Sequence, residues 1–120
     1  MKRVLIVEDQ PEIRELIRMT LELESFEIHE ADNGPSGLQL AREMKPNLVL
    51  LDVMMPGGMD GFAVCEALRR EPALKRTRVV MLTARAQAED HARGKAAGAD
   101  AYLVKPFSPR ELLGTVSRLS

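Results

Sequence analysis

The fold of this sequence is constrained most by four short apolar runs. Each is followed directly by a polar residue that could bind a ligand or take part in a reaction. They are residues 4–7 before Glu8 and Asp9, 48–51 before Asp52, 79–82 before Thr83, and 102–104 before Lys105. Continuous apolar runs of this length are typical of strands buried on both faces of a parallel sheet. Parallel strands all end at one edge, where the sites of open α/β sheets are built. We therefore expect the polar endings to converge.

Helix signals alternate with these runs along the whole chain. Pro11 marks a first helix, because its missing N–H is harmless at a helix start. A further strand is expected over residues 26–31. The next helix opens at Asn33 and Pro35 and ends near Glu43, before Lys45-Pro46. Three more helices are expected: one carrying Phe62, Val64, Cys65 and Leu68, one from Gln87 to Ala97 ended by Gly98, and one starting near Ser108-Pro109.

Five strands and five helices in strict alternation predict an α/β fold with a doubly wound parallel sheet. The predicted strand order is 2-1-3-4-5, as in flavodoxin-like folds, which places the first and third strands side by side at the topological switch point. Glu8 and Asp9 would then lie beside Asp52. The whole sequence, residues 1–120, is expected to form one domain.

Composition excludes several classes of function. Net charge is -1, and there are three Phe, one Tyr and no Trp, which argues against direct binding to nucleic acid. No apolar stretch approaches the roughly 18 residues that a membrane span needs. Cys65 is the single cysteine, and the four-residue apolar run after Met1-Lys2-Arg3 is too short for a signal peptide. We expect a cytoplasmic domain without membrane association.

The expected cluster of Glu8, Asp9 and Asp52 is unstable without a compensating cation. Two unit charges 4 Å apart repel by roughly 4 kcal/mol at an effective dielectric constant of 20. Magnesium suits a site with few carboxylates, because it keeps several waters and accepts phosphate oxygens. Glu8 and Asp9 alone could equally cap the following helix. Together with Asp52, they favour a Mg²⁺ site.

Five pieces of sequence, in register over nearly the whole chain, resemble the receiver domain of bacterial two-component response regulators. They are Glu8-Asp9, Asp52-Val53-Met54-Met55-Pro56, Met59-Asp60-Gly61, Thr83-Ala84 and Lys105-Pro106-Phe107. The resemblance implies that Asp52 accepts a phosphoryl group from the phosphohistidine of a sensor histidine kinase or histidine phosphotransfer protein. It also implies that Asp9, Asp52 and the backbone carbonyl of Met54 bind Mg²⁺ directly, with Glu8 acting through water.

The same resemblance assigns roles to Thr83, Lys105 and Tyr102. Lys105 and the hydroxyl of Thr83 would contact the phosphoryl group, and a cis peptide bond before Pro106 would aim the lysine. Tyr102 would swing inward when Thr83 moves, and so remodel the face formed by the fourth helix, fifth strand and fifth helix. Each of the three also has an ordinary structural interpretation, as a solvated lysine, a helix cap and a half-buried strand residue.

Partners and output follow from the resemblance only in outline. A downstream output domain or protein is expected, and a homodimer through the remodelled face is possible, with charged pairs from Lys95, Asp100, Arg110, Glu111 and Arg118. The sequence stops at Ser120, directly after the last helix, so it is either a stand-alone regulator or a piece of a larger protein. No turnover of an external substrate is expected.

Other functions fit less well. A phosphohydrolase of the haloacid dehalogenase type would place an aspartate where Met54 stands, and a flavodoxin-like cofactor site would not begin with acidic residues. A receiver used only for protein contacts would not need the full residue set. Two departures from the family pattern adjoin the site: the extra glycine of Gly57-Gly58 and Glu8 in place of aspartate. Arg85 is expected to face the site, whereas His29, His91, Cys65 and the methionines near Asp52 are given no chemical role.

Overall fold

The computed structural model describes residues 2–55, 58–84 and 88–119. They form one parallel sheet in the order β2-β1-β3-β4-β5, which confirms the predicted fold. The strands are β1 (Lys2–Val7), β2 (Phe26–Ala31), β3 (Leu48–Asp52), β4 (Arg78–Thr83) and β5 (Ala101–Val104). The helices are α1 (Pro11–Leu21), α2 (Gly34–Met44), α3 (Gly61–Arg69), α4 (Ala88–Ala97), α5 (Pro109–Leu119) and a short 3₁₀ turn, η1 (Pro72–Leu74), that was not predicted. Within these described ranges no helix has the length and apolar character needed to cross a membrane.

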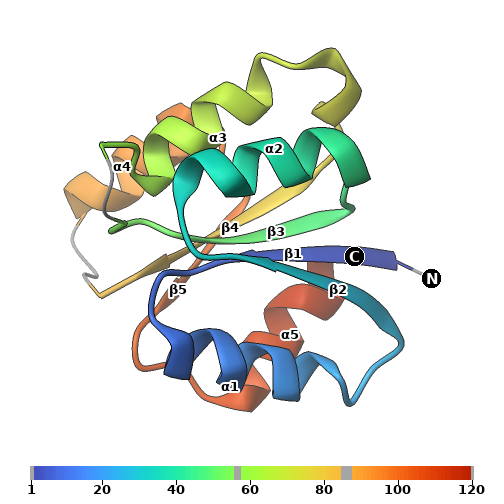
Figure 1. Cartoon of the computed structure of the whole chain (residues 1–120). Coiled ribbons are helices and arrows are strands. Elements are labelled where there is room, and N and C mark those ends of the chain that lie inside the picture. Colours follow the sequence, from blue (N-terminus) through green and yellow to red (C-terminus); the bar gives the residue numbers. More distant parts are fainter. Residues whose placement is uncertain (1, 56–57, 85–87, 120) are drawn as a thin grey trace.

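Helices cover both faces of the sheet. Helices α2, α3 and α4 lie on one face, and α1 and α5 lie on the other (Figure 1). Leu5 and Val7 of β1 belong to the core under α2 and α3, whereas Val4 and Ile6 belong to the core under α1 and α5. A strand buried on both faces needs apolar residues at every position, which explains the uninterrupted runs in the sequence.

The helix ends follow local signals in the sequence. The side chain of Asn33 accepts a hydrogen bond from the Ser36 amide at 2.9 Å and so caps α2. Lys45 adopts the left-handed conformation, with φ of 47°, directly before Pro46, and ends the same helix one residue later than predicted. Gly98 follows α4 with φ of 101°, as expected. The predicted start of α4 at Gln87 lies outside the described residues.

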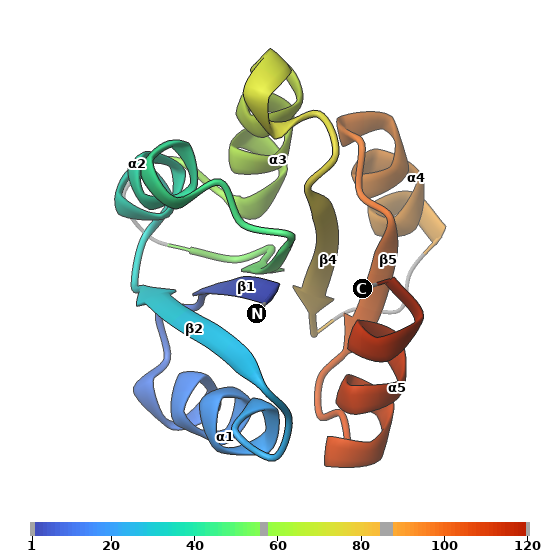
Figure 2. The same ribbon diagram turned by 90° about the vertical axis from the view of Figure 1, so that its right-hand side faces the viewer.

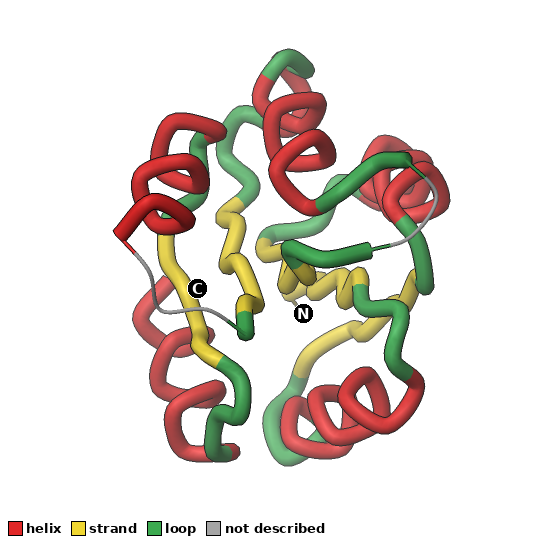
Figure 3. The backbone as a smooth tube through the Cα atoms, turned by 90° about the vertical axis from the view of Figure 1, so that its left-hand side faces the viewer, coloured by secondary structure: helices red, strands yellow, loops and turns green. Residues whose placement is uncertain are grey.

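The strand register aligns the four polar endings at one edge of the sheet. Val7 pairs with Leu51, Asp52 pairs with Leu82, and Thr83 pairs with Val104. Figure 3 looks onto this edge, where the loops that follow the strands gather. The peptide bond between Lys105 and Pro106 is cis, as predicted.

Candidate functional site

Three carboxylates lie together at the carboxyl ends of β1 and β3. Glu8 is fully buried, Asp52 is 3% exposed, and Asp9 is half-buried. One carboxylate oxygen from each lies within 4.8 Å of those of the other two. The backbone fixes this arrangement on both strands: the Glu8 amide donates to the Ala31 carbonyl at 3.0 Å, and the Val53 amide donates to the Leu82 carbonyl at 2.9 Å. The predicted convergence of Glu8, Asp9 and Asp52 is therefore observed.

Lys105 reaches into this cluster from the end of β5. Its Nζ lies 2.7 Å from Oε1 of Glu8 and 3.2 Å from Oδ1 of Asp52. Its backbone amide donates to the Thr83 carbonyl at 2.7 Å, which anchors the loop after β5 to the end of β4. Burial alone would lower the pKa of Lys105, but hydrogen bonds and the charges of Glu8 and Asp52 outweigh burial and raise it. Lys105 thus stays protonated at the site.

The cluster carries more negative than positive charge among the described residues. Burial, followed by the hydrogen bond and negative charge of Glu8, raises the pKa of Asp52 to about 8, although Lys105 acts in the opposite direction. A carboxyl group held so far above its usual pKa marks a candidate functional position. Buried and half-buried carboxylate oxygens, in excess over the one ammonium, form a donor set that fits a hard divalent cation such as Mg²⁺.

Thr83 and a small cavity lie next to the carboxylates. Thr83 ends β4 and is 3% exposed. With Ala84 and Arg93 it lines a cavity of about 140 Å³, whose other walls include Val53 and Met54. These two residues directly follow Asp52, so the cavity borders the carboxylate cluster. Thr83 therefore lies at the carboxyl edge of the sheet, beside the carboxylate cluster, as expected from the sequence.

Comparison with known proteins agrees with this geometry. Residues 4–117 match the family model of the response regulator receiver domain. The chain belongs to this receiver domain family. Membership implies phosphorylation-dependent signalling in a two-component system, and the family is generally a switch rather than a substrate-converting enzyme. It does not favour the haloacid dehalogenase or flavodoxin-like alternatives.

Individual relatives support the assignment. The chain is 47% identical to the transcriptional regulatory protein SrrA of Staphylococcus aureus over 116 residues, which are 97% of this chain and 46% of that protein. The chain therefore spans about half the length of the curated relatives it matches. The chemotaxis response regulator CheY4 of Vibrio cholerae has a TM-score of 0.94 at 37% identity, over 100% of this chain and 99% of that one.

A further similar structure is relevant to the carboxylate cluster. The receiver domain of sensor histidine kinase PA1611 from Pseudomonas aeruginosa PAO1 has a TM-score of 0.90 at 26% identity, over 98% of this chain and 96% of that one. That receiver has a magnesium ion coordinated in its active site cleft.

Tyr102 of this receiver domain does not join the carboxylate cluster. Its ring stacks on His91 of α4, with centroids 4.4 Å apart and an interplanar angle of 2°. Its hydroxyl donates to the His91 carbonyl at 2.5 Å, and a Cβ on Gly94 would lie only 2.4 Å from that hydroxyl. His91, which was given no chemical role from the sequence, is half-buried against Tyr102. The weak apolar pattern of α4 hid this contact.

The residues predicted to lack a chemical role are accounted for by packing or local contacts. Cys65 is fully buried and donates to the Ala97 carbonyl at 3.3 Å, and burial raises the pKa of its thiol to about 11. His29 contacts Glu27 at 3.0 Å. Met55 and Met59 pack against the core, whereas the Met54 side chain is 66% exposed. Gly57 and Arg85 lie outside the described residues.

Sequence reasoning missed several side chains that support the site. The backbone N–H of Gln10 donates to Oε2 of Glu8 at 3.2 Å, and the side chain of Arg14 donates to the Glu8 carbonyl at 2.8 Å. Neither contact follows a sequence pattern, although Gln10 directly precedes α1 and Arg14 is its fourth residue. Asp100 was expected to form pairs on the dimer face, but it binds Arg69 at 2.9 Å at the opposite edge of the sheet.

Proposed function

We propose that this receiver domain accepts a phosphoryl group on Asp52 and thereby switches a protein-binding surface. The observation that carries the proposal is the position of Asp52, which is buried between the carboxylates of Glu8 and Asp9 and the ammonium of Lys105. Burial and the neighbouring Glu8 raise the pKa of Asp52 to about 8, and pKa values perturbed this strongly are typical of functional positions.

The reaction is an in-line transfer between a phosphohistidine and a carboxylate. An Oδ atom of Asp52 attacks phosphorus while the P–N bond breaks, and the imidazole nitrogen leaves with the electron pair and takes up a proton. The product is an acyl phosphate on Asp52. Catalysis of such a transfer depends mainly on alignment and on stabilisation of charge. Lys105 already lies 3.2 Å from Asp52 and would pair with a phosphoryl oxygen, to which the hydroxyl of Thr83 would donate.

Asp9, Asp52 and the backbone carbonyl of Met54 would hold Mg²⁺, with Glu8 acting through a water molecule. The ion would neutralise the carboxylates and supply positive charge to the transferring group. The magnesium in the PA1611 receiver supports this part of the proposal. So does the excess of carboxylate over ammonium at the site.

The readout would pass through Thr83 and Tyr102 to the face formed by α4, β5 and α5. Figure 2 shows α4 and α5 on either side of β5. Inward movement of Tyr102 would break its stacking on His91 and its hydrogen bond to the His91 carbonyl, and so change the surface of α4. A few charge-assisted hydrogen bonds to the phosphoryl group suffice to bias such a switch.

The proposed partners follow from this role. The donor is a sensor histidine kinase or a histidine phosphotransfer protein in the cytoplasm. The receiver would act on an output domain or protein, and its α4-β5-α5 face would also serve a homodimer. SrrA, about half of which this chain matches, is a transcriptional regulatory protein, which supports an output in gene control.

Phosphorylation by a small donor tests the central step. Incubation with phosphoramidate and Mg²⁺ should add one phosphoryl group to the wild-type protein by intact mass spectrometry, because phosphoramidate carries the same P–N bond as phosphohistidine. Asp52→Asn should abolish the addition, and omission of Mg²⁺ should slow it strongly. Asp32→Asn, which changes an exposed aspartate, is the matched control and should be labelled normally. Full labelling of Asp52→Asn would disprove the assignment.

The switch has a convenient reporter, because Tyr102 is the only tyrosine and the chain has no tryptophan. Its fluorescence should change when Mg²⁺ and beryllofluoride, a phosphoryl analogue, bind to the wild-type protein. His91→Ala is the comparison variant, since it removes the stacked ring and should reduce the change. Fluorescence that stays constant while the analogue binds would contradict the role of Tyr102 but not that of Asp52.

A further inference from the structure

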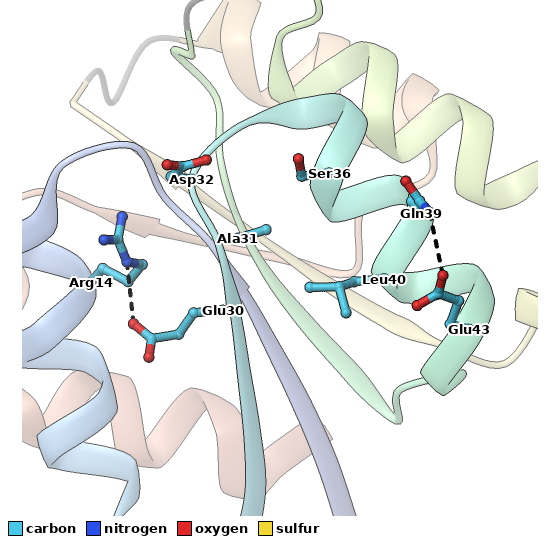
Figure 4. Close-up of a pocket in the computed structure, with 8 residues that line it drawn as sticks. All are labelled: Arg14, Glu30, Ala31, Asp32, Ser36, Gln39, Leu40 and Glu43. Carbon is cyan, nitrogen blue, oxygen red and sulfur yellow. Dashed lines mark hydrogen bonds and ion pairs between the residues drawn. The ribbon is translucent and has the colours of Figure 1, made fainter.

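A side chain outside the carboxylate cluster holds the backbone that carries it. Arg14 lies in the first turn and a half of α1 and is largely shielded from solvent, with 22% of its side chain exposed. Its Nη1 donates to the backbone carbonyl of Glu8 at 2.8 Å, and its Nε lies 3.2 Å from Oε1 of Glu30 on β2. Figure 4 shows the pair bridging the helix and the edge strand.

We infer that Arg14 is a positioning residue of the site: its guanidinium fixes the peptide group between Glu8 and Asp9 and so sets the direction of both carboxylates. The inference rests on the proposed function, because it assigns to Arg14 a contribution to Mg²⁺ binding by Glu8, Asp9 and Asp52.

Arg14 completes a set of contacts that immobilises Glu8. The Glu8 amide donates to the Ala31 carbonyl, and the carboxylate of Glu8 contacts Lys105 through Oε1 and the Gln10 amide through Oε2. The bond from Arg14 occupies the carbonyl. Without that bond, no contact from α1 holds the peptide group between Glu8 and Asp9. The orientation of this peptide group affects the contacts that Glu8 makes with Gln10 and Lys105.

Glu30 allows Arg14 to do this without adding net charge near the cation site. The Glu30 carboxylate lies 3.2 Å from Arg14 and 2.5 Å from Arg18, one turn further along α1. The planar guanidinium can donate in two directions at once, to a carbonyl and to a carboxylate, which a lysine ammonium does less well. Arg14 therefore gives the site an oriented hydrogen bond, and Glu30 balances its charge.

Arg18 provides a matched control within the same helix. It shares the Glu30 carboxylate with Arg14, but of the two arginines only Arg14 has a hydrogen bond to Glu8. Arg14→Met and Arg18→Met each remove one cation from Glu30 and keep a good helix former. Only Arg14→Met removes the bond to the carbonyl of Glu8, so a difference between the variants measures that bond.

Two measurements on the full chain test the inference. The first is hydrogen exchange of the backbone N–H of Gln10, measured by NMR in the absence of metal, since that N–H donates to the Glu8 carboxylate. Exchange should be faster in Arg14→Met than in Arg18→Met. The second is Mg²⁺ affinity by calorimetry, which should fall about tenfold or more in Arg14→Met, as for outer contacts of other metal ligands. Arg18→Met should bind Mg²⁺ like the wild type, and Arg14→Lys should recover part of the loss.

The outcomes separate this inference from the proposed function. Wild-type Mg²⁺ affinity and Gln10 exchange in Arg14→Met would overturn the inference while phosphorylation of Asp52 stands. Equal losses in Arg14→Met and Arg18→Met would also overturn it, because the effect would then belong to Glu30 or to α1 as a whole. Failure of the wild-type protein to bind Mg²⁺ would contradict the proposed function instead, and the exchange data would still test Arg14. Should Arg14→Met unfold, Arg14→Gln against Arg18→Gln carries the same comparison, because glutamine also removes the cation and is also a good helix former.

Discussion

Charged side chains bind one another at both edges of the sheet, and the edges differ in how those charges are balanced. At the amino-terminal edge, Arg69 donates to the Gly98 carbonyl at 2.9 Å, to the Thr77 carbonyl at 2.7 Å and to the Asp100 carboxylate at 2.9 Å. Asp100 also accepts the Val79 amide at 2.8 Å. At the carboxyl edge three carboxylates share the single ammonium of Lys105 among the described residues.

The difference separates a structural ion pair from a functional site. A charged group whose hydrogen bonds and charge are satisfied within the protein holds the loops around it in place and has no free donor or acceptor for a ligand. The carboxyl edge instead keeps uncompensated charge, which lowers stability until a cation arrives. Removal of Arg69 should therefore destabilise the protein with or without metal, whereas Mg²⁺ should affect stability only through the carboxyl edge.

The largest effect is expected at the balanced edge. Arg69→Met should lower the free energy of unfolding by about 3 kcal/mol, because it removes hydrogen bonds to two carbonyls and to the Asp100 carboxylate. Urea denaturation measures the loss, which should be the same with and without Mg²⁺. Arg70→Met is the control, since the Arg70 side chain is 76% exposed and its one ion pair with the described residues is to Glu66, one turn away. Similar losses in the two variants would show that the Arg69 contacts do not stabilise the fold.

Metal should produce the next largest effect, at the opposite edge. Mg²⁺ at a hundred times its dissociation constant should stabilise the wild-type protein by about 2.7 kcal/mol, and removal with EDTA should reverse this. Thermal melting across a Mg²⁺ series gives the shift. Asp52→Asn should respond much less, because it lacks one proposed ligand, whereas Arg69→Met should respond fully. An equal response in Asp52→Asn would place the ion elsewhere.

The carboxyl edge could be predicted from the sequence, whereas the Arg69 contacts at the amino-terminal edge could not. The fold and the carboxylate cluster follow from local patterns, because each apolar run fixes a strand and the residue after it falls on a known edge. Glu8, Asp52 and Lys105 were found in this way. The ligand role of Met54 and the hydrogen bond from Thr83 stay predictions.

The contacts that were missed depend on long side chains crossing between distant segments. Arg69 bonds to residues 29 and 31 positions away, and nothing near it in the sequence marks those partners. Arg14 is one of two arginines on an amphipathic helix, so its bond to Glu8 is visible only in three dimensions. The His91 ring was missed because α4 has too weak an apolar pattern to show which side faces inward.

Protonation of Asp52 at the carboxyl edge should change the free energy of unfolding with pH, by less than the loss of Arg69 or the binding of Mg²⁺. Its pKa is raised from 3.8 to about 8 in the folded, metal-free protein, so the folded state keeps a proton that the unfolded state releases. The contribution of protonated Asp52 to the free energy of unfolding is complete below about pH 4. It decreases as the pH rises and is lost above about pH 8. Relative to Asp52→Asn, the wild type in EDTA should lose about 1 to 2 kcal/mol between about pH 5 and pH 7, well within the limit of about 1.4 kcal/mol per pH unit. A constant difference in urea denaturation would contradict the raised pKa.

The smallest effect is expected for an exposed charge at the edge that carries the site. Arg93 of α4 lies 3.6 Å from Asp60 and 4.3 Å from the centre of the Phe62 ring, but 61% of its side chain is exposed. Solvent screens such contacts, so Arg93→Met should cost about 0.5 kcal/mol in urea denaturation, and less in high salt. A loss as large as that of Arg69→Met would break the comparison. It would mean that the contacts of Arg93 hold α4 next to the site more strongly than their exposure indicates. The two edges would then not differ only in how their charges are balanced.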